Sequence, residues 1–260
     1  MSNFIEYKEE DNIGIITINR EDKLNALNGD VLDELRDLLE SLADKRELVG
    51  LILTGAGEKS FIAGADIAAM TDMDKDEAHL FTLKGQQVSL MLEECRFPII
   101  ACVNGFALGG GLEMALSCDF IYATNNALFG LPEVSLGLIP GFGGTQRLAK
   151  VIGRSRAKEL VYSAKKIDCE TAEKYGLVLE RFENKSDLLT AAMKTLSMVA
   201  KNSPLAVGIA KSTINQGVDL ANVDGLEIEA KLFAELFESY DMKEGTQAFI
   251  DKRKANFKGK

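Results

Sequence analysis

Short apolar runs alternate with helix-length stretches over the first two thirds of this chain. The apolar runs cover residues 12–19, 49–54, 98–103 and 120–123, and apolar residues recur at helical spacing in 31–42 and from about 74 to 94. Runs that are both short and almost wholly apolar are typical of strands buried on both faces, which parallel sheets provide. The alternation therefore predicts an α/β fold with a mostly parallel sheet.

The last third of the sequence has a different pattern, because no further apolar strand runs are seen and helical spacing prevails. Four helices are expected, with Ser203-Pro204 and Gly217 as breaks between them: 186–200, 204–216, 220–239 and 241–255. A length of 260 residues suits one large domain with an appendage. We therefore expect an α/β core over residues 1–200 and a helical region over 201–260 that serves oligomerisation.

Charge and composition exclude several classes of protein. The formal net charge of −10 argues against general binding to nucleic acid or to a membrane surface. The first twelve residues lack the features of a signal peptide, and no apolar run reaches the roughly 20 residues that span a bilayer. Four cysteines without CxxC spacing indicate free thiols in a reducing compartment. A cytoplasmic protein is expected.

The single histidine, His79, lies in the sequence DKDEAHLF, which predicts an exposed helix. One histidine excludes a His-rich metal site, and a Ser-His-Asp triad would have to use it. Neither a metal nor a triad is therefore expected.

Glycine-dense turns follow the apolar runs. Gly55-Ala-Gly-Glu-Lys-Ser60 does not match a phosphate-binding loop, since Glu58 precedes the lysine where glycine is needed. Phe61-Ile-Ala-Gly-Ala-Asp66 and Gly109-Gly-Gly-Leu-Glu113 each precede a helical pattern. Taken singly, the first is explained better as a tight connection between strand and helix, and the second as a helix start packed close to a neighbour, than as a binding site. Together they offer two convergent backbone N–H donors, which is the core of an oxyanion hole.

Two glutamates stand in apolar surroundings. Glu113 is flanked by Leu112 and Met114, and Glu133 follows Pro132 in a turn with apolar flanks, which predicts a buried loop. Buried carboxylates are costly and are seldom kept without a partner or a task. Two carboxylates near one water can divide the work of general base and general acid. A further glycine-dense loop, 137–146, is expected to hold a water or a ligand or to form a wide turn, with Thr145 as the cap of the next helix.

Taken together, these motifs resemble the enoyl-CoA hydratase (crotonase) family, and most of all its short-chain enoyl-CoA hydratases. The resemblance runs from about residue 4 to the end and rests on residues 54–67, 104–113, 129–134, 139–148 and 249–254. It implies a crotonase-like spiral of repeated ββα turns with a C-terminal helical region. It also implies a homo-oligomer, either a trimer or a hexamer built as a dimer of trimers.

The resemblance implies specific roles for residues of this chain. The backbone N–H groups of Ala65 and Gly110 match the donors to the thioester oxygen, Glu113 and Glu133 match the acid/base pair, and Gly141 matches a donor near the catalytic water. Coenzyme A is expected as part of an acyl-CoA thioester substrate, with no separate cofactor. Further substrate contacts are expected at Ala63, Asp66, Ile67, Leu108, Gly109, Pro132 and Lys252. The basic stretch around Lys252 is explained equally well as a solvated tail.

Because both glutamates are kept, the resemblance favours reversible syn hydration of a trans-2-enoyl-CoA to a 3-hydroxyacyl-CoA. Glu113 is expected to activate the water and Glu133 to supply the proton to C2. The alternatives are another reaction of the family, such as double-bond isomerisation, and a non-catalytic binding member such as an RNA binder. Three departures from hydratases concern the pocket and not the acid pair: Leu112, Leu131 and Ala68-Ala69. Met70, Thr71 and Met73 are candidates for the acyl pocket, and the motifs leave acyl-chain length and pathway open.

Overall fold

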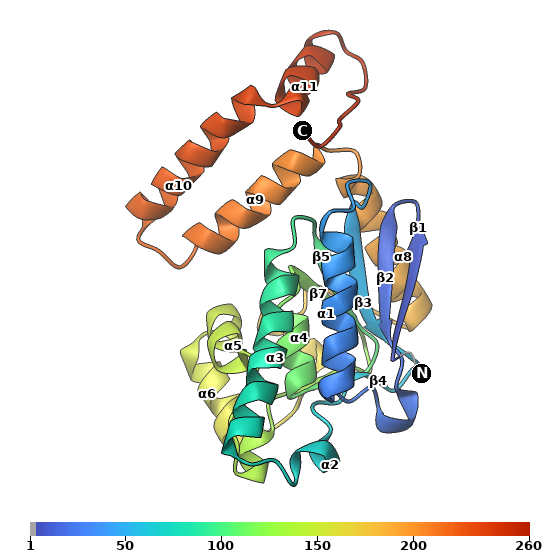
Figure 1. Cartoon of the computed structure of the whole chain (residues 1–260), viewed down its shortest axis with the longest axis vertical. Helices are drawn as coiled ribbons and strands as arrows, with labels where there is room; N and C mark the ends of the chain where they lie inside the picture. The colour runs from blue at the N-terminus through green and yellow to red at the C-terminus, as the bar shows by residue number, and fades with distance from the viewer. Residues whose placement is uncertain (1–3) are drawn as a thin grey trace.

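Two sheets form the centre of the molecule, which a computed structural model describes over residues 4–260 (Figure 1). The larger sheet has the order β1 (Ile5–Glu10), β2 (Ile13–Ile18), β3 (Gly50–Gly55), β5 (Ile99–Val103), β7 (Phe120–Thr124) and β10 (Glu180–Phe182). The smaller sheet has the order β4 (Ser60–Ile62), β6 (Phe106–Leu108), β8 (Leu128–Gly130) and β9 (Ile167–Asp168). All neighbouring strands are parallel except the pairs β1–β2 and β8–β9. The predicted α/β class with a mostly parallel sheet is confirmed.

The chain repeats one unit, in which a strand joins the larger sheet, the next strand joins the smaller sheet, and a helix follows. The helical parts are α2 (Ile67–Met70) and α3 (Lys75–Glu94) after β3–β4, then α4 (Gly110–Leu116) after β5–β6, then η2 (Glu133–Leu136) and α5 (Gly144–Ile152) after β7–β8. This is the expected spiral of ββα turns. Since β4, β6 and β8 are parallel neighbours, the turns that leave their carboxyl ends meet at one edge.

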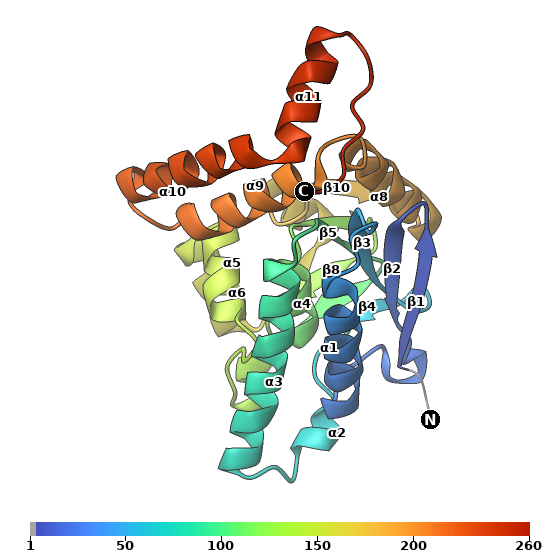
Figure 2. The ribbon, with the colours of Figure 1, turned by 45° about the horizontal axis from the view of Figure 1, so that its top comes forward.

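The core lies on both faces of the larger sheet. Helices α1 (Gly29–Ala43), α3 and α4 lie over one face and α8 (Lys185–Val199) over the other (Figure 2). Alternate residues of β3 pack on opposite faces of the sheet. Leu51 and Leu53 belong to the larger hydrophobic cluster, and Ile52 belongs to a second cluster with Leu188 and Leu196 of α8. Strands used on both faces explain the unbroken apolar runs in the sequence.

Strand β1 escapes the sequence prediction because it is an edge strand. Ile5 and Tyr7 are half-buried, the other four residues of β1 are exposed, and three of its six residues are glutamates. A chain segment that covers no core on its outer face carries too weak an apolar pattern to be recognised.

The remaining elements are helical apart from short links. They are η1 (Glu21–Lys23), α6 (Arg154–Ser163), α7 (Cys169–Lys174), α9 (Pro204–Gly217), α10 (Asn222–Glu235), η3 (Leu236–Glu238) and α11 (Tyr240–Ile250). The four expected C-terminal helices are confirmed, although the last ends at Ile250 and not at residue 255. Helices α9, α10 and α11 extend away from the sheets (Figure 1). The predicted break at Ser203-Pro204 lies between α8 and α9, and there Ser203 caps α9 and Pro204 opens it.

Two smaller expectations are also met. His79 is exposed on α3, and all four cysteines are unpaired. None of the helices within the described residues is both long and apolar enough to cross a membrane.

Candidate active site

The turn after β4 presents the N–H group of Ala65. A parallel bridge joins Ala65 to Leu27, in which the Leu27 N–H donates to Gly64 O (2.8 Å) and the Asp66 N–H donates to Leu27 O (2.7 Å). In such a bridge the central residue directs its own N–H away from the partner. Within residues 4–260 no acceptor lies on that N–H, so it is available to a ligand.

The turn after β6 brings Gly109 against its neighbours. Gly109 has φ 51°, its N–H donates to Gly130 O (2.9 Å), and a Cβ there would lie 3.0 Å from Glu133 Oε1 and 3.7 Å from Gly64 Cα. Only glycine allows this approach without strain. The next residue, Gly110, opens α4, and its N–H has no acceptor among the described residues.

Glu113 lies one turn into α4, and only 2% of it is exposed. Its Oε1 accepts hydrogen bonds from the N–H groups of Phe142 (2.8 Å) and Gly144 (2.7 Å). Burial raises the pKa of the carboxyl, while those two N–H groups, the nearby Arg147 and the backbone of Gly141 oppose the rise. The donors favour the ionised form, which is the form that a general base needs.

The same contacts correct the expected cap of α5. Thr145 does not cap this helix: the cap is Gly143, at φ 111°, and no side chain of the cap accepts a hydrogen bond. The Glu113 carboxylate satisfies the Gly144 N–H instead, so a residue distant in sequence does the work of a local cap.

Glu133 opens η2, with Pro132 before it. Glu133 as a whole residue is only half-buried, and the segment that follows it is exposed, so the prediction of a buried loop is wrong for this segment. One oxygen of the Glu133 carboxylate is nevertheless buried. Oε2 of Glu133 is the one buried side-chain nitrogen or oxygen in residues 4–260 with no hydrogen-bond partner. Burial raises the pKa of Glu133 to about 7, and the charge of Glu113 adds to the rise.

The other expected substrate contacts fall into separate places. Ala63 lies in the turn after β4, Leu108 lies at the end of β6, and Gly141 lies in the loop before α5. All three therefore belong to the same segments as the residues described above. Asp66 forms an ion pair with Arg20 at 2.8 Å, which braces the turn, and Ile67 is 47% exposed. Lys252 follows α11, at the opposite end of the molecule from α2, so one chain does not bring it to this site (Figures 1 and 2).

The three departures from the hydratase pattern differ in their surroundings. Leu112 and Leu131 are fully buried, and Leu131 lies beside Glu113 because both approach Gly144, where a Cβ would be 3.0 Å from Leu131 Cδ1. Ala68 and Ala69 are exposed on α2. Met70 and Met73 pack against the core, with parts still exposed.

Sequence reasoning missed the donors to Glu113. Both are backbone N–H groups, which leave no mark in the identity of the side chain, and the glycine density of residues 137–146 was the only signal.

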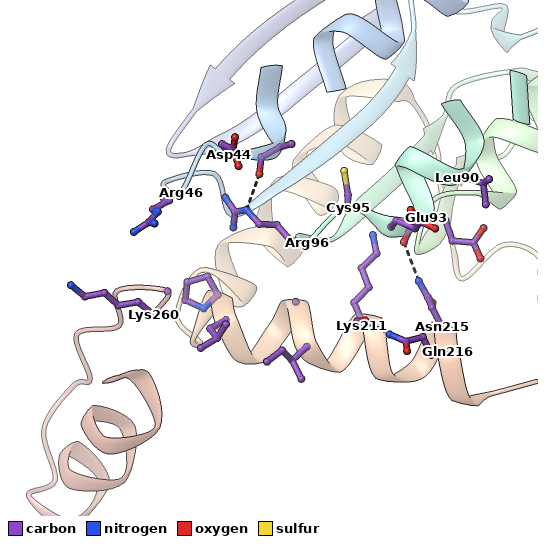
Figure 3. Close-up of a pocket in the computed structure, with 18 residues that line it drawn as sticks. Asp44, Arg46, Leu90, Glu93, Cys95, Arg96, Lys211, Asn215, Gln216 and Lys260 are labelled. Carbon is purple, nitrogen blue, oxygen red and sulfur yellow. Dashed lines mark hydrogen bonds between the residues drawn. The ribbon is translucent and has the colours of Figure 1, made fainter. Parts of the chain in front are cut away.

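Two cavities, of about 810 and 840 Å³, lie elsewhere: the first runs along the length of α9, and the second lies at the amino-terminal end of that helix. The first is lined by α9 and by the ends of α1 and α3, with Lys211, Asn215 and Glu93 on its walls (Figure 3). Neither is lined by Glu113, Glu133 or the two glycine turns. Size alone therefore does not locate the site, and the convergent carboxylates and N–H groups do.

The sequence matches the model of the enoyl-CoA hydratase/isomerase family over residues 8–260. It is 44% identical to the short-chain-enoyl-CoA hydratase of Clostridium acetobutylicum, over 95% of this chain and 94% of that protein. It is 43% identical to the crotonyl-CoA hydratase of Syntrophomonas wolfei, over 96% of each. The crystal structure of an enoyl-CoA hydratase from Bacillus anthracis is similar with a TM-score of 0.95 and 37% identity, covering 99% of this chain and 100% of the other.

Proposed function

This chain belongs to the enoyl-CoA hydratase/isomerase family and is an enoyl-CoA hydratase, and we propose that it adds water to short trans-2-enoyl-CoA thioesters through Glu113 and Glu133. The product is the 3-hydroxyacyl-CoA, and the reaction is reversible. The observation that carries the proposal is the pair of acids at one edge of the sheet, with Glu133 Oε2 buried and unpartnered. A buried carboxylate oxygen without a partner is costly, and a substrate water supplies what it lacks.

The thioester oxygen is proposed to lie between the N–H groups of Ala65 and Gly110. Both groups lack an acceptor within residues 4–260, and both belong to turns that meet at Gly109. Donors aimed at the oxygen stabilise the enolate-like charge that develops on attack at C3. The amino-terminal end of α4, at Gly110, adds a partial positive charge.

Glu113 is proposed as the base and Glu133 as the acid. Glu113 takes a proton from the water whose oxygen bonds to C3, and Glu133 delivers its proton to C2 on the same face. The two N–H donors favour the ionised form of Glu113, whereas a pKa of about 7 leaves much of Glu133 protonated at neutral pH. Exchange of a proton between the two acids through the next water restores the starting state, and the pair titrates as a unit.

Coenzyme A enters as part of the substrate, and no separate cofactor takes part in these steps. We propose a cytoplasmic enzyme that assembles through residues 201–260 into a trimer or a dimer of trimers. Large apolar side chains on α10 and η3, among them Val223, Phe233 and Phe237, are more than half exposed in the single chain, which supports a partner copy there. Lys252 then reaches coenzyme A only from a neighbouring subunit.

The test is to measure the hydration of trans-2-enoyl-CoA thioesters of different chain lengths. The reaction is monitored through the decrease in absorbance of the conjugated thioester. We expect the four-carbon substrate to have the highest kcat/KM. Faster conversion of a 3-enoyl-CoA to the conjugated isomer would assign the site to isomerisation. Absence of turnover at every chain length, together with salt-sensitive binding of RNA, would replace the proposal with a binding function.

A further inference from the structure

Helix α3 carries a row of polar side chains behind the loop that contacts Glu113. Gln86, Ser89 and Glu93 are spaced by three and four residues, so they share one face of the helix. The Gln86 side-chain amide donates to Gly141 O (2.8 Å), in the loop between η2 and α5. Ser89 and Glu93 instead contact Arg147, which lies on α5 just after the loop.

Arg147 connects this row to the loop. Its Nε and Nη2 donate to Glu93 Oε2 at 2.9 and 2.6 Å, and its Nη1 donates to Ser89 Oγ (3.2 Å) and to Phe142 O (3.0 Å). The guanidinium thus holds the carbonyl of the residue whose N–H donates to Glu113. Gly143 leaves the necessary room, since a Cβ there would lie 2.2 Å from Nη1.

The end of α3 that provides Glu93 is itself fixed. The Asn215 side-chain amide of α9 donates to Glu93 O at 3.0 Å (Figure 3). The side chain of Arg147 is 15% exposed and that of Glu93 is 39% exposed, so the ion pair is shielded from solvent on the arginine side. The fixed helix end and the partly shielded ion pair keep the guanidinium in one position.

We propose that Arg147, held by Glu93, is a positioning residue for the catalytic base. It fixes the Phe142 carbonyl, so that the N–H groups of Phe142 and Gly144 stay aimed at the base. It also places one positive charge behind Glu113. This inference rests on the proposed function, because it assigns Arg147 a role through Glu113 as the base.

The charged groups around Glu113 are few, which makes the effect of Arg147 measurable. Helix α4 carries no other ionisable side chain, and β4 and β6 carry none. Glu133 faces Glu113 from η2 and Arg147 faces it from α5. The other charged side chains of the middle and end of α3 and of α5 are paired away from the site or exposed: Lys84 with Asp33, Lys150 with Asp219, and Glu94.

The test measures the pH dependence of kcat/KM for crotonyl-CoA hydration in Arg147→Met, Arg147→Lys and the wild type. The acid limb of this profile reports ionisation of the base in the free enzyme. Loss of the cation and of the aimed N–H groups disfavours ionised Glu113, so the limb of Arg147→Met should move to higher pH by at least about 0.5 unit. Its kcat should fall about 10- to 100-fold. Arg147→Lys retains the positive charge but cannot make the several hydrogen bonds of the guanidinium. Its acid limb should therefore lie closer to that of the wild type than the limb of Arg147→Met does, while its kcat stays reduced.

Lys150→Met is the matched control, because Lys150 lies on the same helix as Arg147. Its ion pair is with Asp219, in the turn after α9, and not with the loop before α5. It should keep the wild-type limb and kcat. A folded Arg147→Met with an unmoved acid limb, or an Arg147→Lys limb displaced as far as that of Arg147→Met, would overturn the proposal. If Arg147→Met does not fold, Arg147→Gln takes its place with the same expected shift. Failure of the wild type to hydrate any enoyl-CoA would refute the proposed function itself, which is a separate result.

Discussion

At the scale of single residues, the two glutamates differ in how their oxygens are satisfied. Glu113 Oε1 receives two backbone N–H donors, while Glu133 Oε2 receives none. At Glu113 the N–H donors oppose the rise in pKa that burial causes, whereas at Glu133 burial and the charge of Glu113 raise the pKa to about 7. The difference supports a division of roles in which Glu113 is the base and Glu133 is the acid.

The amide substitutions Glu113→Gln and Glu133→Gln test this division. Each keeps the shape of the side chain and removes its proton transfer, so each should lower kcat for crotonyl-CoA hydration by at least about 100-fold. Steady-state rates with the purified variants provide the measurement, and Glu94→Gln, on the exposed end of α3, is the control expected to hydrate at the wild-type rate. Near-normal hydration by either active-site variant would show that its acid is not needed.

The raised pKa of Glu133 also makes a prediction about stability. Its folded value of about 7 lies above the ordinary value of 4.5, so the folded protein holds this proton more tightly than the unfolded chain does. The corresponding stabilisation is complete below about pH 4.5 and is lost as pH rises through 7. Glu133→Gln, which has no proton to lose, should therefore gain in Tm relative to the wild type between pH 5 and pH 8. Equal pH dependence of Tm in the two proteins would contradict the raised pKa.

At the scale of elements, the site depends on how closely α3 approaches the loop before α5. Gly85 of α3 lies against the Phe142 ring, where a Cβ would be 2.2 Å from two ring carbons. The ring of Phe142 also packs on Phe81, with centroids 5.4 Å apart. The helix therefore sets the position of the backbone that donates to Glu113.

Gly85→Ala should displace this ring and the donors attached to it. We expect a loss of about 1–3 kcal/mol in the free energy of unfolding, the usual cost of overpacking, although alanine is the better helix former. We also expect kcat to fall about 10-fold or more, since small displacements of catalytic groups are costly. Gly29→Ala in α1 is the matched control, because no atom lies within 4 Å of its Cβ position. Denaturant unfolding and hydration rates measure both effects. An unchanged kcat would show that the position of α3 does not affect the site.

At the scale of the whole molecule, the helical end is joined to the core by a buried lysine. Lys211 of α9 is 8% exposed, and its Nζ donates to Asp119 Oδ2 (2.9 Å) and to the carbonyls of Leu92 and Phe97 (3.3 and 3.2 Å). Asp119 Oδ2 also accepts from the N–H of Ile99 at the start of β5. One cation therefore links α9, the end of α3 and the larger sheet, on the wall of the cavity in Figure 3.

Lys211→Met should loosen this junction. The substitution leaves the Asp119 carboxylate without its cation and the carbonyls of Leu92 and Phe97 without the lysine donor, which should cost about 2–4 kcal/mol of the free energy of unfolding. Lys150→Met removes an exposed lysine of similar shape and should cost less than about 1 kcal/mol. Denaturant unfolding compares the stability of the two variants, and light scattering shows whether the substitution changes the oligomeric state. Equal stability of the two variants would mean that the buried lysine does not hold the helical end.

The sequence by itself determined the α/β class, the C-terminal helices and the family, and it pointed to Glu113 and Glu133 as the acid pair that we propose. These follow from local patterns: apolar runs, helical spacing, the Ser203-Pro204 start of α9, and carboxylates within apolar neighbours. Such patterns can be recognised in the sequence because residues that are close in sequence belong to the same helix or strand. The spiral of ββα turns was predicted from the family resemblance, and so was the proposed role of Ala65 and Gly110 as oxyanion donors.

The tertiary structure alone decided which groups meet. Glu113, and not Thr145, satisfies the start of α5, Asp66 is occupied by Arg20, and Lys252 lies at the far end of its own chain. The Arg147–Glu93 ion pair, which lies behind the proposed base Glu113, was likewise not predicted. The physical reason is the same throughout: backbone donors carry no side-chain signature, and pairing between distant segments is set by packing of whole elements.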